Sequence, residues 1–244
     1  MIGIGTIINV LTIIAGSTVG MIAQKGIPET MQKAVMKVLG IAVMFIGLSG
    51  TLAEMLVVTA DGISTQGTML MIISLVLGTI AGELLRIEDR LESLGDKLKG
   101  LRIFRNASAT FTEGFVTATL VVSVGAMAII GSFNDGLGLG AEVLITKSIL
   151  DFVSTMIFAS TLGVGVLCSS IPMGIYQGLL TVLAQFLKPL FDGTNIVSDL
   201  SLVGSVLIFA IGINLFASKS IKVGNMLPAL IVPVAYGLVM KIIA

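Results

Sequence analysis

A lysine and an aspartate stand four positions apart in an apolar stretch of this sequence. Residues 142–162 are long and apolar enough to cross a membrane, yet they include Lys147 and Asp151. Residues three and four apart share one face of an α-helix, so the two charges belong to a polar stripe. Its other members are Ser148, Ser154 and Thr155. Charges inside a bilayer are rare, costly and usually functional, which makes the stripe a candidate site for a cation or a proton.

The expected depth of Asp151 favours a working site. Asp151 follows Glu142 by nine residues, roughly 13 Å along a helix, which is near the middle of a hydrocarbon core about 30 Å thick. We interpret Asp151 as an ion ligand or proton carrier, with Lys147 as a counter-charge that is displaced or deprotonated during transport. The alternative is a static pair of these two residues that fixes helix packing.

A glycine-rich segment, residues 131–140, precedes this stretch. Its alternating glycines are not expected to form a stable helix, and its Asn-Asp-Gly sequence is a turn signal. Non-helical backbone at membrane depth is tolerated inside protein or along a cavity. The segment is therefore either a re-entrant loop that offers Asn134 and Asp135 to a cation near Asp151, or a flexible outer loop.

Uncharged polar side chains also occur inside other apolar segments. Each is expected to form a hydrogen bond between helices. Asn9 is in addition a candidate supporting ligand for the ion. The set comprises Thr6, Asn9, Gln177, Gln185 and Asn214.

The composition places the chain in a membrane. Only 11% of its 244 residues are charged and the mean hydropathy is +1.09, whereas a soluble domain carries about 25% charged residues. The formal net charge is zero, so no nucleic-acid partner is expected. Histidine, the commonest general base and metal ligand, is absent, and Cys168 is the only cysteine. We expect neither enzyme activity nor a cofactor.

Eight segments approach the roughly 20 apolar residues that a transmembrane helix needs. They are residues 2–23, 34–58, 67–85, 111–131, 142–162, 172–191, 200–217 and 226–243. An all-α polytopic fold is therefore predicted, with residues 1–244 forming a single integral membrane domain. The last segment is short and contains Pro228 and Pro233, so it is expected to be kinked or re-entrant, and seven helices are the alternative.

Basic residues set the expected orientation, because cytoplasmic loops carry an excess of Lys and Arg. With eight spans and the N-terminus outside, both ends lie outside; with seven spans the C-terminus lies inside. Eleven of the fourteen basic residues then fall in cytoplasmic segments or the adjoining helix ends: Lys25, Lys33, Lys37, Arg86, Arg90, Lys97, Lys99, Arg102, Arg105, Lys219 and Lys222. The outer loops hold Asp61, Asp135 and Asp192.

The longest polar stretch, residues 86–109, is predicted to be a cytoplasmic amphipathic connector. Leucines recur there at helical spacing with charged residues between them. Such a helix can lie on the inner leaflet, where its basic residues contact anionic headgroups. These residues are Lys97, Lys99, Arg102 and Arg105. The alternative is a plain connecting helix.

A weak internal repeat is predicted to divide the chain into two halves of four helices, residues 1–131 and 142–244. The sequence around Pro28 resembles the sequence around Pro172. Transporters are often built from such repeats, with the substrate site between them. Chance similarity among helices rich in glycine and alanine is the alternative.

The repeat bears on the two charges. Aligning the prolines places Gly3 opposite Lys147 and Ile7 opposite Asp151. Because one copy has no charge at these positions, the fold itself is not expected to require the pair.

Two glycine pairs are suited to close helix packing, within the chain or between copies in a homo-oligomer. They are Gly16 with Gly20, and Gly78 with Gly82.

Several runs resemble one bacterial family. They are residues 5–9 (GTIIN), 16–20 (GSTVG), 125–132 (GAMAIIGS), 147–148 and 151–152. The sequence is similar along essentially its whole length to an inner-membrane family known as domain of unknown function 554, some members of which carry the label of transport protein. The resemblance implies a bacterial cytoplasmic membrane and transfers no functional residue.

The sequence therefore predicts a small bilayer-embedded transporter or channel for an inorganic cation or small solute, with Asp151 near mid-membrane as its ion or proton site. The alternative is a membrane scaffold or sensor that transports nothing and acts through residues 86–109.

Overall fold

The computed structural model describes residues 2–24, 28–59, 62–102, 104, 107–123, 126–191, 193–217 and 221–243. Several residues used in the predictions lie outside these ranges: Lys25, Asp61, Arg105, Gly125, Asp192 and Lys219. Within the described ranges, seven helices are long and apolar enough to cross a membrane, and a bent helix pair supplies an eighth span if it is counted as one. The predicted all-α polytopic membrane fold is confirmed.

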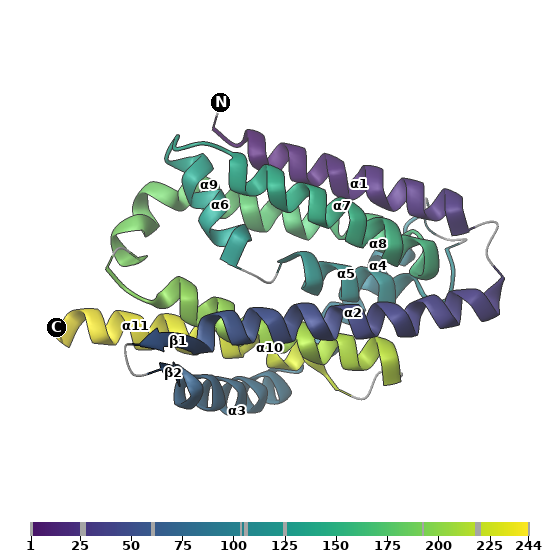
Figure 1. The fold of residues 1–244 in the computed structure, drawn as a ribbon. Coiled ribbons are helices and arrows are strands. Elements are labelled where there is room, and N and C mark those ends of the chain that lie inside the picture. Colours follow the sequence, from purple (N-terminus) through teal and green to yellow (C-terminus); the bar gives the residue numbers. More distant parts are fainter. Residues whose placement is uncertain are drawn as a thin grey trace. The chain divides into compact units, whose positions relative to one another are not determined.

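The elements follow the predicted spans closely (Figure 1). The long helices are α1 (Ile4–Gln24), α2 (Glu29–Met55), α3 (Thr68–Leu85), α7 (Glu142–Leu162), α9 (Ser170–Phe191) and α10 (Ile196–Ala217). The shorter helices are α4 (Ile87–Lys99), α5 (Phe111–Ser123), α6 (Ala126–Gly136), α8 (Gly165–Cys168) and α11 (Ile231–Ile243). A 3-10 helix, η1 (Val223–Leu230), precedes α11, and the two together form the seventh of the long apolar helices. Two short strands, β1 (Leu56–Thr59) and β2 (Gly62–Thr65), complete the described elements.

Two spans differ from the prediction, one at its end and one at its beginning. The second does not continue as a helix to residue 58, because β1 leaves it after Met55 and pairs antiparallel with β2. Both strands are rich in β-branched residues, which favour extended backbone. The last predicted span begins as η1, with Pro228 inside it, and continues as the α-helix α11.

The chain forms two compact units. Unit 1 comprises Met1–Lys37, Asp89–Ser123 and Met127–Lys188, and unit 2 comprises Val38–Glu88, Val124–Ala126 and Pro189–Ala244. Each unit therefore draws on both predicted halves of the sequence, and the internal repeat stays a prediction.

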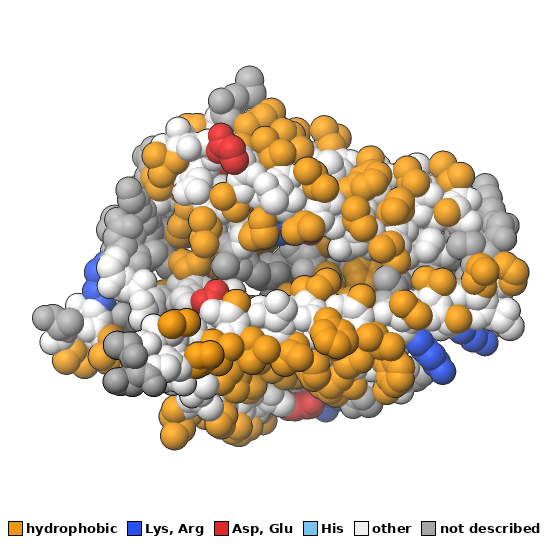
Figure 2. Space-filling view, in the orientation of Figure 1, with side chains coloured by type: hydrophobic (Ala, Val, Ile, Leu, Met, Phe, Trp, Pro, Cys, Tyr) orange, Lys and Arg blue, Asp and Glu red, His pale blue; other side chains and the backbone are white. Residues whose placement is uncertain are grey.

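Unit 1 shows the inside-out polarity of a membrane protein. Along α9 one face is buried and includes two polar side chains, Gln177 and Thr181. The opposite face is exposed and apolar, with Ile171, Ile175, Leu179, Val182 and Phe186. Apolar side chains cover much of the surface visible in Figure 2. This arrangement suits contact with lipid outside and hydrogen bonding inside.

Glycines allow α1 and α7 to lie side by side and parallel in unit 1 (Figure 1). A Cβ atom at Gly16 would lie 2.4 Å from the carbonyl oxygen of Phe152, and one at Gly20 would lie 2.1 Å from that of Met156. In unit 2 the pair Gly78 and Gly82 packs in the same way against η1. Both predicted glycine pairs thus serve packing within the chain.

The predicted connector contains the helix α4. In unit 1 this helix packs on α5, where Thr112 Oγ1 donates a 2.6 Å hydrogen bond to Asp96 and Leu98 contacts the apolar cluster of Phe111 and Phe115. Lys97 on α4 is exposed. These contacts explain how α4 is held against α5.

Candidate functional site

The fourth predicted span is broken near its middle. The axes of α5 and α6 differ by 64°, so the span predicted over residues 111–131 is formed by two helices at an angle to each other. α5 has 13 residues, roughly 20 Å, which is too short to cross a core about 30 Å thick. The last four carbonyl groups of a helix have no partner within it, so the end of α5 offers backbone acceptors within unit 1.

Lys147 meets one of these acceptors. Its Nζ donates a 2.8 Å hydrogen bond to the carbonyl oxygen of Val122, at the C-terminal end of α5. The same Nζ forms an ion pair with the carboxylate of Asp151, one turn further along α7. A cation is favoured at the C-terminal end of a helix, where the dipole is negative. Lys147 therefore joins the broken span to the carboxylate.

Both charges are buried. Lys147 is 6% exposed and Asp151 is 7% exposed. Burying two charges is costly unless they are paired and their remaining hydrogen-bonding capacity is used. The carbonyl of Val122 and the amide of Asn9, which interacts with the Asp151 carboxylate, supply further partners.

Asn9 connects the ion pair to α9. Its Nδ2 donates a 3.2 Å hydrogen bond to Oε1 of Gln177, and both side chains are fully buried. Gln177 was expected only to form a hydrogen bond between helices. The structure places it beside the predicted ligand Asn9, and hence within the same polar network as Lys147 and Asp151.

Two other groups of side chains border the Asn9–Gln177 pair, one on each side along α1. Towards the N-terminus of α1, the hydroxyl groups of Thr6 and Thr181 lie 3.4 Å apart. In the other direction a buried apolar cluster follows, formed by Ile13, Val122, Ala128 and Met173. The amide pair thus lies in one polar layer between a hydroxyl layer and an apolar layer.

The hydroxyl groups of the predicted stripe bind their own helix. Ser148 Oγ donates to the carbonyl oxygen of Leu144 at 2.6 Å, and Thr155 Oγ1 donates to that of Asp151 at 2.7 Å. Ser154 is half-buried on the same helix. The Ser148 hydroxyl therefore donates its hydrogen bond to the backbone of α7.

Asp135 lies elsewhere and has a different partner. Its two carboxylate oxygens accept hydrogen bonds from the backbone N–H groups of Gly3 at 3.1 Å and Gly5 at 2.9 Å. These are unpaired donors at the start of α1, so Asp135 satisfies the helix N-terminus. Gly5 lies against Leu144, which precedes Asp151 by seven residues, or roughly 10 Å. Asp135 is thus not beside Asp151.

The segment that carries Asp135 is partly helical. α6 continues through Gly136, so the expectation that alternating glycines would prevent a helix is wrong for residues 131–136. Tertiary contact overrides the weak helix propensity of glycine: a Cβ atom at Gly136 would lie 2.2 Å from the carbonyl oxygen of Thr181. The turn comes afterwards, where Gly138 and Gly140 have positive φ. Asn134 is half-buried within α6.

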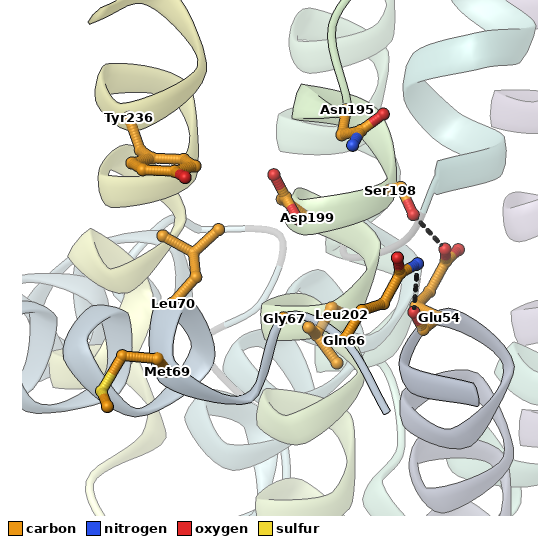
Figure 3. Close-up of a pocket in the computed structure, with 10 residues that line it drawn as sticks. All are labelled: Glu54, Gln66, Gly67, Met69, Leu70, Asn195, Ser198, Asp199, Leu202 and Tyr236. Atoms are coloured by element: carbon orange, nitrogen blue, oxygen red, sulfur yellow. Dashed lines mark hydrogen bonds between the residues drawn. The ribbon is translucent and has the colours of Figure 1, made fainter. Parts of the chain in front are cut away.

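A second polar site lies within unit 2, where a pocket of about 440 Å³ opens to the surface. Figure 3 shows Glu54 between Ser198 and Gln66. The Ser198 hydroxyl donates a hydrogen bond to the Glu54 carboxylate, and the Gln66 side-chain amide donates one to the Glu54 backbone carbonyl at 3.3 Å. Asp199 and the half-exposed Tyr236 line the same pocket. Two carboxylates with no basic residue among the lining side chains make this pocket attractive to cations.

Sequence reasoning did not single out these pocket residues. No local pattern links them, because the β-hairpin and the start of α10 bring Glu54, Gln66 and Asp199 together only in the fold.

Comparison with known proteins agrees with this picture of a membrane protein. Residues 4–238 match the family described as "Protein of unknown function (DUF554)". The match covers nearly the whole chain and confirms the resemblance seen in the sequence.

Two curated relatives are similar over almost their full lengths. The "Uncharacterized membrane protein YdfK" of Bacillus subtilis is 28% identical over 229 residues, which cover 94% of this chain and 93% of the relative. The "Uncharacterized protein YqgA" of Escherichia coli is 30% identical over 233 residues, which cover 93% of each. No solved structure matches significantly.

Proposed function

The chain belongs to the DUF554 family of membrane proteins, and we propose that it is a small transporter or channel for an inorganic cation or a small solute. The ion or proton site is the buried Lys147–Asp151 pair, and the N-terminus lies outside the bacterial cytoplasmic membrane. The chain acts without enzyme chemistry or a cofactor.

One observation carries this proposal: a buried ion pair at the break of a membrane span. Broken helices at membrane depth are tolerated where they are enclosed by protein or line a cavity, and transporters use their ends to bind ions. A purely structural pair would not require the break, because a continuous helix satisfies its own backbone.

The contacts support a simple cycle. Lys147 is held by two acceptors, the Asp151 carboxylate and the Val122 carbonyl. When an ion or proton binds Asp151, the ion pair weakens while Lys147 keeps its bond to the end of α5. The α5–α6 break then changes its contacts with α7, and the hydroxyl and apolar layers on either side of Asn9 open in turn.

Flux measured in proteoliposomes tests the proposal, with a panel of monovalent and divalent cations, protons and small solutes. The Asp151→Asn variant keeps the shape of the side chain and removes its charge, so we expect flux to fall by about tenfold or more, as for loss of a charged hydrogen-bond partner. Asp89→Asn, an exposed carboxylate on α4, is the matched control and should leave flux unchanged. If every detected flux survives Asp151→Asn, the site assignment is wrong.

A second candidate function is that of a membrane scaffold or sensor. Exposed basic side chains at Lys97 on α4 and at Arg102 after it favour contact with anionic headgroups. Under this alternative the protein moves no solute, and Asp151→Asn has no effect on signalling or partner recruitment.

A further inference from the structure

Two amide atoms beside the ion pair are buried without a hydrogen-bond partner among the described residues. They are Oδ1 of Asn9 and Nε2 of Gln177. Both side chains are fully buried, and the other two amide atoms already bond to each other. A buried polar group without a partner is costly, so two of them on neighbouring amides call for an explanation.

The two atoms are complementary in character. Asn9 Oδ1 is an acceptor and Gln177 Nε2 is a donor. They belong to amides that are already joined by a hydrogen bond, so they lie on neighbouring groups. A molecule that satisfied both would donate a hydrogen bond to Asn9 and accept one from Gln177.

The charges around the amides favour an uncharged molecule. Lys147 and Asp151 neutralise each other formally, and both are already engaged. A bare metal cation would use only acceptors and would leave the Gln177 donor unsatisfied, while an anion would face Asn9 Oδ1 and the Asp151 carboxylate. Among the described residues, no cluster of three metal-binding side chains occurs. An uncharged molecule with its own donor and acceptor satisfies both atoms.

The neighbouring layers limit the size of this molecule. Thr6 with Thr181 closes one side of the amide layer, and the cluster around Ile13 and Met173 closes the other. Thr6 and Ile13 are seven residues apart on α1, which is roughly 10 Å along the helix. A solute at this layer is therefore limited to a few non-hydrogen atoms.

We propose that Asn9 and Gln177 form the selectivity site for a small uncharged solute, about the size of urea, that both donates and accepts hydrogen bonds. This inference rests on the proposed transport function and narrows its substrate class. The Lys147–Asp151 pair keeps its role as the ion or proton site that adjoins the solute.

Stopped-flow light scattering of proteoliposomes, with urea as the probe, tests this inference. Trimethylamine N-oxide, which only accepts hydrogen bonds, is the comparison solute for the wild-type protein. We expect urea to enter faster than in protein-free liposomes, and trimethylamine N-oxide to enter no faster. Asn9→Leu and Gln177→Met should each reduce urea entry by about tenfold. Thr18→Val, which removes an exposed hydroxyl on α1, should not.

The outcomes separate this inference from the proposal on which it rests. Urea entry that survives both substitutions, or wild-type entry that is equal for the two solutes, overturns the selectivity site. A cation flux that depends on Asp151 without any urea entry also overturns it and leaves the transport function standing. If no ion or solute moves at all, the transport function itself is wrong. Because the two solutes are compared in the wild-type protein, the test does not depend on the folding of a variant.

Discussion

Replacing Lys147 by methionine is expected to destabilise the protein strongly. The substitution removes the partner of Asp151, a residue that is 7% exposed, and leaves the end of α5 without its cationic contact. Removing one member of a buried ion pair costs about 3–5 kcal/mol, because the remaining charge is uncompensated. The free energy of unfolding, measured by denaturant titration in detergent micelles, should fall by that amount.

A double variant separates the two contributions of the pair. Lys147→Met combined with Asp151→Leu removes both charges and keeps similar volumes. Replacing a buried pair by apolar residues is often neutral or stabilising, so the double variant should recover most of the lost stability. Lys97→Met, at an exposed site on α4, is the control for the substitution itself. If Lys147→Met unfolds at the same denaturant concentration as Lys97→Met, the Lys147–Asp151 pair does not contribute the expected free energy of unfolding.

Replacing Gly20 by alanine is the second change with a large expected effect. The added Cβ atom would lie 2.1 Å from the carbonyl oxygen of Met156 and 3.0 Å from the Cβ of Ala159. Because the first neighbour is backbone, the clash is relieved only if α1 and α7 move apart. Overpacking of this kind typically costs about 1–3 kcal/mol, and a backbone clash belongs at the upper end or beyond.

Gly178 provides a matched control for this prediction. It lies on α9 of the same unit, and a Cβ atom there would meet no atom within 4 Å. Gly178→Ala should therefore leave the thermal unfolding midpoint in detergent unchanged or raise it, since alanine favours helix by about 1 kcal/mol. Equal midpoints for the two alanine variants would contradict the close packing of α1 on α7.

The spans could be predicted because hydropathy is a local property. α3 and α7 begin and end within one residue of their expected limits. The hairpin after Met55 was missed because its valines and threonines extend an apolar run that reads equally well as helix. Length and hydropathy do not distinguish a strand from the last turn of a span.

The candidate site could be predicted in part. Lys147 and Asp151 were identified because charges in an apolar run are rare, and helical spacing places them on one face. The break between α5 and α6 was missed because the sequence stays apolar across it. Its acceptor, the backbone carbonyl of Val122, carries no signal in the sequence.

Asp135 shows why a residue type alone does not identify a ligand. An Asn-Asp-Gly sequence indicates a turn, and an acidic residue near a membrane site is a reasonable cation ligand. In the fold, two backbone N–H groups at the start of α1 donate hydrogen bonds to that carboxylate. Only the fold shows that Asp135 lies at the start of α1, and nothing near Asp135 in the sequence indicates it.

The flux of the double variant Lys147→Met with Asp151→Leu in proteoliposomes tests most directly whether the buried pair is a working site. If the pair is a working site, the double variant folds and reconstitutes like the wild type but has lost the flux that the wild type shows. A double variant with wild-type flux would contradict a working role for Lys147 and Asp151, because it would show that the pair only holds the helices together.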